Sequence, residues 1–243
     1  MTAVFVHGNP ETAAVWRPLL ATLAREDVIT LSPPGFGAPA PDGFAATFDE
    51  YVAWLIAAVE EMGEPVDLVG HDWGSNHVIR VAGERPDLLR SWCADTGGAW
   101  APDYVWHDSA RMWQTPGEGE AAVRWWLDLG VVGRTELNVS LGMTAEVADG
   151  FDETMGRCIL GVYRSIRDEG LGPWRDGLPE ASARPGLVVI PTADEYTGGQ
   201  ARHRWMAQQS GARVAVLEGL GHWWMLEDPA AGARALERFW RES

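Results

Sequence analysis

The sequence has 243 residues, 46% of them hydrophobic, and its formal net charge at pH 7 is −16. This length allows a substantial buried core, organised as one domain with an insertion rather than as two independent units. The charge comes from 35 acidic against 19 basic residues and would repel phosphate backbones and anionic lipid headgroups, which argues against nucleic-acid and membrane partners.

Short apolar runs alternate with segments of helical periodicity over much of the chain. We expect strands at residues 3–6, 28–31, 66–70, 90–94, 186–190 and 212–217. We expect helices among them at residues 12–25, 48–62, 76–84, 200–209 and 229–241. This alternation predicts an α/β fold with a mostly parallel sheet flanked by helices on both faces.

The alternation stops between residues 98 and 178, where helix-like segments rich in tryptophan are expected at 121–129, 146–155 and 157–166. We interpret residues 98–178 as a helical cap inserted into a core formed by residues 1–97 and 179–243. The chain has 14 tryptophans, many of them between Trp92 and Trp126. They could wall an aromatic cavity or pack in the core, and the sequence leaves both alternatives open.

Targeting and redox features are few. The amino-terminal segment lacks a basic region followed by a long apolar stretch, and nothing later approaches a membrane span. Cys93 and Cys158 lie among apolar residues without CxxC or Cys/His spacing, so we expect buried thiols rather than a metal site. These features predict a cytoplasmic protein.

Residues 66–75, Val-Asp-Leu-Val-Gly-His-Asp-Trp-Gly-Ser, join a predicted strand directly to a predicted helix. Their Gly-x-Asp-x-Gly pattern resembles the nucleophile elbow of α/β-hydrolases, with Asp72 where the familiar motif has serine. Gly70 and Gly74 remove the side chains that would collide in so sharp a turn. Asp72 could alternatively be a helix N-cap, a position that aspartate often takes.

Asp72, Asp194 and His222 occur in the chain order nucleophile, acid, histidine, each just after a predicted strand. Ligands bind at these strand ends in open parallel sheets. A carboxylate would fix the tautomer of His222, whose other nitrogen would activate the attacking group. Because Asp72 is already ionised near neutral pH, His222 is left to activate water in a second step. Asp95 also follows a strand and is the alternative acid.

The chain is similar to the α/β-hydrolase branch that contains epoxide hydrolases and haloalkane dehalogenases. Both attack an sp3 carbon with an aspartate and pass through an alkyl-enzyme ester. The resemblance covers nearly the whole chain and rests on His7-Gly8-Asn9-Pro10, residues 34–37, 70–74 and 113–117, Tyr163-Arg164 and Gly221-His222-Trp223. It implies an α/β-hydrolase fold whose small cap follows the sixth strand in the family's count, although this chain starts without the family's leading strands. It also implies an oxyanion hole formed by the backbone N–H groups of Asn9 and Trp73.

The leaving group separates the two kinds of enzyme. Epoxide hydrolases stabilise the epoxide oxygen with two cap tyrosines, and Tyr163 resembles the second of them, although its spacing also fits a core position. The family's spacing places Ser109 at the first, so Tyr104 could serve only with a local insertion in the cap. Dehalogenases hold the halide with N–H donors, which Asn9 and Trp73 resemble.

We therefore predict a cofactor-independent epoxide hydrolase that forms a vicinal diol. The alternatives are a haloalkane dehalogenase, an esterase-like hydrolase of the same fold, and a ligand-binding relative without activity, for which an intact triad would have no use. We expect a small hydrophobic or aromatic substrate in a pocket lined by Trp106, His107 and Trp113. His71, beside the nucleophile, is interpreted as positional. We expect no metal, and a monomer or homodimer.

Overall fold

The computed structural model describes residues 2–148, 150–166 and 170–243. At its centre is a six-stranded sheet in the order β2-β1-β3-β4-β5-β6, in which every neighbouring pair is parallel. The strands are β1 (Ala3–Val6), β2 (Val28–Leu31), β3 (Val66–Gly70), β4 (Leu89–Ala94), β5 (Gly186–Pro191) and β6 (Arg213–Leu217). These bounds confirm the predicted strands and the predicted fold class.

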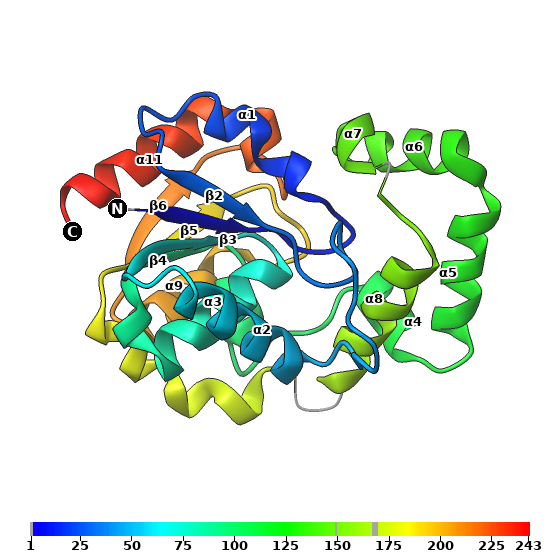
Figure 1. Ribbon diagram of the computed structural model, residues 1–243, viewed down its shortest axis with the longest axis horizontal. Helices are drawn as coiled ribbons and strands as arrows, with labels where there is room; N and C mark the ends of the chain where they lie inside the picture. The colour runs from blue at the N-terminus through cyan, green and yellow to red at the C-terminus, as the bar shows by residue number, and fades with distance from the viewer. Residues whose placement is uncertain (1, 149, 167–169) are drawn as a thin grey trace.

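Helices cover both faces of the sheet (Figure 1). One face carries α1 (Arg17–Leu20) and α11 (Pro229–Arg241), and the other carries α2 (Phe48–Glu60), α3 (Trp73–Glu84) and α9 (Gly199–Gln209). Strand side chains alternate between the faces, so Phe5 packs in the cluster of α1 and α11 whereas Val4 and Val6 pack in the cluster of α2 and α3. β1 and β3 are buried along their whole length, as strands covered on both faces must be.

Two predicted helices differ from the structure. Residues 12–25 form a 3-10 turn, η1 (Ala13–Trp16), and the single turn of α1, because Pro18 has no N–H to continue the hydrogen bonds of the preceding turn. Residues 146–155 do not form one helix. They contribute to α7 (Ala145–Ala148) and α8 (Glu153–Ser165), and the Asp152 carboxylate caps α8 by accepting a hydrogen bond from the Met155 N–H.

The cap helices α4 to α8 lie between β4 and β5 in sequence. They comprise α4 (Asp108–Gln114), α5 (Glu118–Asp128), α6 (Gly130–Ser140), α7 and α8. The cap thus follows the fourth of the six strands in this sheet, whereas the prediction numbered that strand as the sixth, a count that includes the family's leading strands. In Figure 1 the cap lies beside the sheet, at the end toward which β1 and β2 point.

Three short elements connect the cap to the core, namely η3 (Gly97–Trp100), η4 (Gly172–Gly177) and η5 (Pro179–Ala183). Two others lie within the core: η2 (Pro86–Leu88) joins α3 to β4, and α10 (Trp224–Glu227) lies between β6 and α11. Cys93 and Cys158 are buried free thiols, as predicted. Among residues 2–148, 150–166 and 170–243, no helix is long and apolar enough to cross a membrane.

Candidate active site

Asp72 stands at a sharp turn between β3 and α3. Its backbone has φ 49° and ψ −121°, a strained conformation for a residue with a side chain. The flanking glycines permit the turn, because a Cβ on Gly70 would lie 2.5 Å from the Gly74 carbonyl oxygen and a Cβ on Gly74 would lie 2.4 Å from that of Val6. Asp72 precedes α3 but its side chain makes no capping hydrogen bond. Asp72 therefore occupies the N-cap position of α3 without capping the helix through its side chain.

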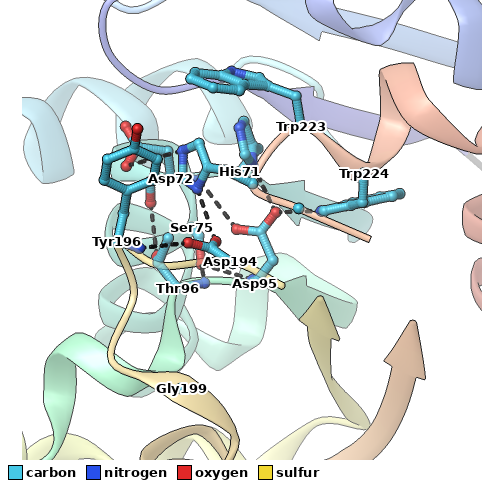
Figure 2. A network of polar contacts seen from close by, with 12 residues as sticks. His71, Asp72, Ser75, Asp95, Thr96, Asp194, Tyr196, Gly199, Trp223 and Trp224 are labelled. Atoms are coloured by element: carbon cyan, nitrogen blue, oxygen red, sulfur yellow. Dashed lines mark hydrogen bonds and ion pairs between the residues drawn. The ribbon is translucent and has the colours of Figure 1, made fainter. Parts of the chain in front are cut away.

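The end of β4 braces this turn. Asp95 Oδ1 accepts a hydrogen bond from the Asp72 N–H at 3.1 Å, and the Thr96 hydroxyl donates to the Asp72 carbonyl at 2.8 Å. The Ser75 Oγ in turn accepts from the backbone N–H groups of Asp95 and Thr96 at 2.9 and 3.0 Å (Figure 2). Both polar backbone groups of the strained residue thus have fixed partners from the neighbouring strand.

His222 joins Asp72 to Asp194. Its Nδ1 lies 2.8 Å from Asp194 Oδ2, and its Nε2 lies 3.9 Å from Asp72 Oδ1. Asp194 follows β5 and also accepts from the Tyr196 N–H at 2.7 Å, while His222 follows β6. The structure therefore pairs His222 with Asp194. Asp95, the alternative acid, contacts the Asp72 backbone and His71 instead.

Burial and charge set the protonation of these groups. Burial raises the pKa of Asp72 to about 6, and the positive charges of His222 and His71 oppose that shift. Burial alone would lower the pKa of His222, but the Asp194 carboxylate outweighs it and the pKa lies above its ordinary value. In the same way, burial works against ionisation of Asp194, but His222 outweighs it and lowers the Asp194 pKa. The pairing of His222 with Asp194 therefore favours the protonated form of His222 and the ionised form of Asp194.

The loop after β1 faces the Asp72 carboxylate. The Asn9 N–H donates to Asp72 Oδ2 at 2.8 Å. Gly8 leaves room for this contact, because a Cβ there would lie 2.2 Å from Asp72 Oδ2. Trp73 is the first residue of α3, where a backbone N–H has no partner within its own helix. The Asn9 side chain lines the adjacent cavity, and its buried Nδ2 has no hydrogen-bond partner in the described residues.

A cavity of about 600 Å³ lies between Asp72 and the cap. Its polar lining comes from Asn9, Asp72, His107, Ser109, Glu118, Tyr163, Tyr196 and His222. The rest is apolar or aromatic and comes from Pro10, Met112, Trp113, Ala121, Ala122, Trp125, Trp126, Leu137, Leu141, Met143 and Trp223. Several tryptophans thus wall the cavity, while Trp92 and Trp100 are buried in the core, so both expected uses of tryptophan occur.

Tyr163 projects from α8 into this cavity and lies 4% exposed. Its ring packs edge to face against Trp73, with centroids 5.0 Å apart, and also contacts Trp113. Burial raises the pKa of the Tyr163 hydroxyl, the charge of Asp72 acts in the same direction, and a hydrogen bond with the Trp73 side chain opposes the shift. The hydroxyl therefore keeps its proton at neutral pH.

The other predicted cap residues lie in different places. The Tyr104 hydroxyl donates to the Tyr196 carbonyl at 2.8 Å, and Tyr104 is not among the described residues that line the cavity. Ser109 does line it. Trp106, expected in the lining, instead stacks on Trp73 with centroids 6.2 Å apart. The position that the family's spacing assigned to the first tyrosine therefore faces the cavity but carries a serine.

His107 adds a donor to the cavity wall. Its Nδ1 accepts a hydrogen bond from the Ala110 N–H at 3.2 Å at the start of α4. Burial lowers the pKa of His107 to about 4, with the charge of His222 acting in the same direction, so the ring is neutral. A neutral imidazole that accepts at Nδ1 carries its proton on Nε2. Among the described residues this N–H has no hydrogen-bond partner, and His107 lines the cavity.

Glu11 and Tyr196 are site residues that the sequence did not single out. Glu11 is 0% exposed, and its Oε1 lies 3.0 Å from His71 Nε2. Tyr196 lies two residues after Asp194, and its ring packs against His222 with centroids 5.2 Å apart. Glu11 directly follows the His-Gly-Asn-Pro segment, and that adjacency was the available signal.

The chain matches the model of the alpha/beta hydrolase family over residues 3–235, and it belongs to that family. It is similar to a haloalkane dehalogenase of Bradyrhizobium diazoefficiens, with 27% identity over 238 residues that cover 85% of this chain and 67% of that protein. This similarity agrees with the branch that the sequence motifs indicated.

Solved structures share the fold at lower identity. A loop variant of a haloalkane dehalogenase from Bradyrhizobium elkanii has 20% identity and a TM-score of 0.72, covering 99% of this chain and 90% of that chain. An enol-lactonase from Burkholderia xenovorans has 20% identity and a TM-score of 0.73, covering 99% of this chain and 91% of that chain. Because proteins of different activity share this fold, the reaction must be argued from the site.

Proposed function

We propose that this hydrolase is an epoxide hydrolase that works through an ester on Asp72. The observation that carries the proposal is the side chain above the nucleophile. Tyr163 lines the cavity and its hydroxyl, which senses the charge of Asp72, keeps its proton, whereas Trp73, the halide donor of dehalogenases by resemblance, is not among the described residues that line the cavity. An epoxide oxygen needs a proton donor when its ring opens, and a halide does not.

In the first step Asp72 opens the ring. Its Oδ2 is held by the Asn9 N–H, while Oδ1 has no donor within hydrogen-bond distance among the described residues and is the free nucleophile. Oδ1 forms a bond to an epoxide carbon, the carbon–oxygen bond of the ring breaks, and its electron pair stays on the departing oxygen. The Tyr163 hydroxyl gives that oxygen a proton, and the Nε2–H of His107 supplies a second hydrogen bond.

In the second step water hydrolyses the ester. His222, oriented by Asp194, takes a proton from water through Nε2, and the hydroxide adds to the carboxyl carbon of Asp72. Negative charge develops on Oδ2, where the Asn9 N–H already lies at 2.8 Å. A donor placed at a developing oxyanion lowers the barrier by about 3 kcal/mol. The intermediate then expels the diol, whose oxygen takes the proton from His222. The carboxylic acid that remains on Asp72 loses the proton brought by the hydroxide, Tyr163 regains the proton that it gave to the epoxide oxygen, and Asp72 returns as a carboxylate.

The cavity supports a neutral, apolar substrate. Among the described residues that line it there is no lysine or arginine, and Glu118 is the one charged group outside the pair Asp72 and His222. A substrate carboxylate would find no cation to pair with except His222, which Asp72 and Asp194 already neutralise. Tryptophan and aliphatic side chains from the cap line the remainder, which suits a hydrophobic or aromatic epoxide.

A haloalkane dehalogenase is the second candidate, and one observation favours it. The buried Nδ2 of Asn9 has no hydrogen-bond partner among the described residues, although it lies in the cavity wall beside Asp72. An unpaired buried N–H group is costly, and a departing halide would satisfy it. The resemblance to a haloalkane dehalogenase points the same way.

Product analysis separates the two reactions. The enzyme is incubated with matched epoxides and terminal haloalkanes that carry the same hydrophobic group, and diol and free halide are measured. We expect diol formation to exceed halide release. Halide release without diol from any epoxide would overturn the proposal in favour of the dehalogenase.

A single turnover in water labelled with oxygen-18 tests the ester itself. We expect unlabelled product and one labelled oxygen in the Asp72 carboxylate, because the oxygen that joins the substrate is Asp72 Oδ1. Label in the first product molecule would mean direct attack by water.

A further inference from the structure

Glu11, His71 and Asp95 form a buried ion triad that the two reaction steps leave without a role. His71 Nδ1 lies 2.6 Å from Asp95 Oδ2, and His71 Nε2 lies 3.0 Å from Glu11 Oε1. The side chains of His71 and Glu11 are 0% exposed and that of Asp95 is 3% exposed. A charge cluster this deep is costly unless its groups satisfy one another.

The remaining bonds of the triad are satisfied by neighbouring N–H groups. Trp223 Nε1 donates to Glu11 Oε1 at 2.5 Å, and Trp224 Nε1 donates to Asp95 Oδ2 at 2.8 Å. Figure 2 shows Trp224 reaching Asp95 from the carboxyl-terminal segment. The second oxygens accept from backbone groups, Glu11 Oε2 from the Gly8 N–H and Asp95 Oδ1 from the Asp72 N–H. Every carboxylate oxygen of the triad therefore has a donor.

The geometry requires His71 to be charged. Each ring nitrogen faces a carboxylate oxygen, and a neutral imidazole would turn a lone pair toward one of them. Burial alone would lower the pKa of His71, but the two carboxylates outweigh it and hold the pKa well above its ordinary value. Glu11 is held ionised by the same contact, because His71 outweighs burial and lowers the pKa of Glu11 to about 2.

This fixed cation lies directly beside the proposed base. The rings of His71 and His222 have centroids 4.7 Å apart. The triad also holds both sides of the reaction centre, since Glu11 binds the Gly8 N–H next to Asn9 and Asp95 binds the Asp72 N–H. The titratable groups that act on His222 are Asp194, Asp72, Glu11, His71, His107 and Tyr196.

We propose that His71 is a positioning residue whose permanent positive charge drives the proton off His222 once the ester has formed. This inference rests on the proposed function. In the free enzyme, the carboxylates of Asp72 and Asp194 favour a protonated His222, which cannot act as a base. Ester formation neutralises Asp72, whereas the charge of His71 persists. The balance then moves toward a neutral His222, which releases its proton to solvent and is ready to accept one from water in the second step. His222 regains the released proton when Asp72 becomes a carboxylate again.

A purely structural triad would hold the loops together but would not set the basicity of His222. The two alternatives are separated by the direction in which the pKa of His222 shifts in two variants, each of which removes one charge from the triad. His71→Gln removes the cation and keeps one N–H donor, so the pKa of His222 should rise. Glu11→Gln removes an anion, keeps the size of the side chain and leaves the His71–Asp95 pair intact, so the pKa of His222 should fall.

The experiment is an NMR titration of ring carbons and nitrogens in the full-length protein labelled at histidine, and it needs no substrate. We expect His71 of the wild-type protein to show an imidazolium signal from pH 5 to pH 9. We expect the midpoint of His222 to rise by about one unit or more in His71→Gln and to fall by a smaller amount in Glu11→Gln. If His71→Gln does not fold, the His71 signal of the wild type and the downward shift in Glu11→Gln carry the test. A neutral His71, or shifts absent or equal in sign, would overturn the proposal.

A kinetic measurement then tests whether the charge of His71 affects the rate of ester hydrolysis. Single-turnover quench experiments on His71→Gln should show ester hydrolysis slowed about tenfold near neutral pH, with the loss recovering as the pH is raised. A structural defect would not recover with pH, so a uniform loss would contradict the proposal. If no ester forms on Asp72 of the wild-type protein, the proposed function fails while the titration still decides the charge of His71.

Discussion

The two walls of the cavity are built in different ways. On the sheet side, Asp72, His222 and Asp194 stand on strand ends and are fixed by hydrogen bonds to one another or to neighbouring loops. On the cap side, Tyr163 is held by aromatic packing against Trp73 and Trp113, and it lines the cavity. In the proposed reaction, the sheet side specifies which bond is made, and the cap side specifies which bond is broken. Replacements on the two sides should fail in different ways.

The largest effect is expected for Asp72→Ala. Removing the nucleophile should abolish ester formation and lower kcat by at least about 10⁴-fold, because the remaining residues can act only on bound water. Intact-protein mass spectrometry after mixing with substrate should show no adduct. Circular dichroism and thermal unfolding serve as controls, since alanine keeps the strained backbone of the turn. Adduct formation on this variant would show that another residue is the nucleophile.

His222→Ala should separate the two steps. Ester formation uses Asp72 and the cap donors and should proceed, whereas ester hydrolysis should slow by roughly 10³-fold for want of a base. The measurement is a stable mass increase that maps to the peptide containing Asp72. Asp194→Asn should show the same trapped ester with a smaller loss. Bound substrate without an adduct in the folded variant would contradict the two-step scheme.

Tyr163→Phe tests the cap side with a change of one hydroxyl. Ring opening of an epoxide should slow by about 10- to 100-fold, the usual value of a hydrogen bond to a developing charge, while haloalkane turnover changes little. Tyr104→Phe is the matched control, because its hydroxyl is bonded to the Tyr196 carbonyl rather than facing the cavity. Equal losses on both substrate classes would make Tyr163 a packing residue.

The pH dependence of the rate of ester formation should follow the protonation of Asp72, on the sheet side of the cavity, and not that of the cap residues. Burial raises the pKa of Asp72 to about 6, and only the carboxylate is a nucleophile. The rate of ester formation should therefore be half-maximal near pH 6 and fall about tenfold for each unit below it. Stopped-flow or quench measurements of the first turnover give this profile. A midpoint near the ordinary value of an exposed aspartate would mean that the carboxylate is well solvated.

The smallest change is expected for Asn9→Ala. The backbone N–H that binds Asp72 Oδ2 remains, so diol formation should change by less than about threefold, whereas a halide would lose its side-chain donor. The ratio of diol to halide rates for matched substrates is the measurement. A large loss on epoxides would show that the Asn9 amide serves the oxygen as well.

Much of the sheet side could be predicted from the sequence. Buried parallel strands appear as short apolar runs, and their topology brings the residues after each strand to one edge. That is why Asp72, Asp194 and His222 could be grouped without coordinates. The choice between Asp194 and Asp95 could not be made this way, because both follow strands. Only the packing of β4 beside the elbow turns Asp95 toward the Asp72 backbone.

The cap side and the triad needed the tertiary structure. Which of Tyr104, Ser109 and Tyr163 reaches the cavity depends on how cap helices pack over the sheet, and helical periodicity does not encode that. Glu11 and His71 are ordinary in sequence, because a charge beside a turn is usually solvated. Burial removes the water that would screen them, and Coulomb attraction then makes the buried triad. The sequence by itself determined the sheet and the position of Asp72 at its elbow, since these follow from local periodicity and chain order. The cap side of the cavity and the buried triad were decided by distances between side chains on separate elements.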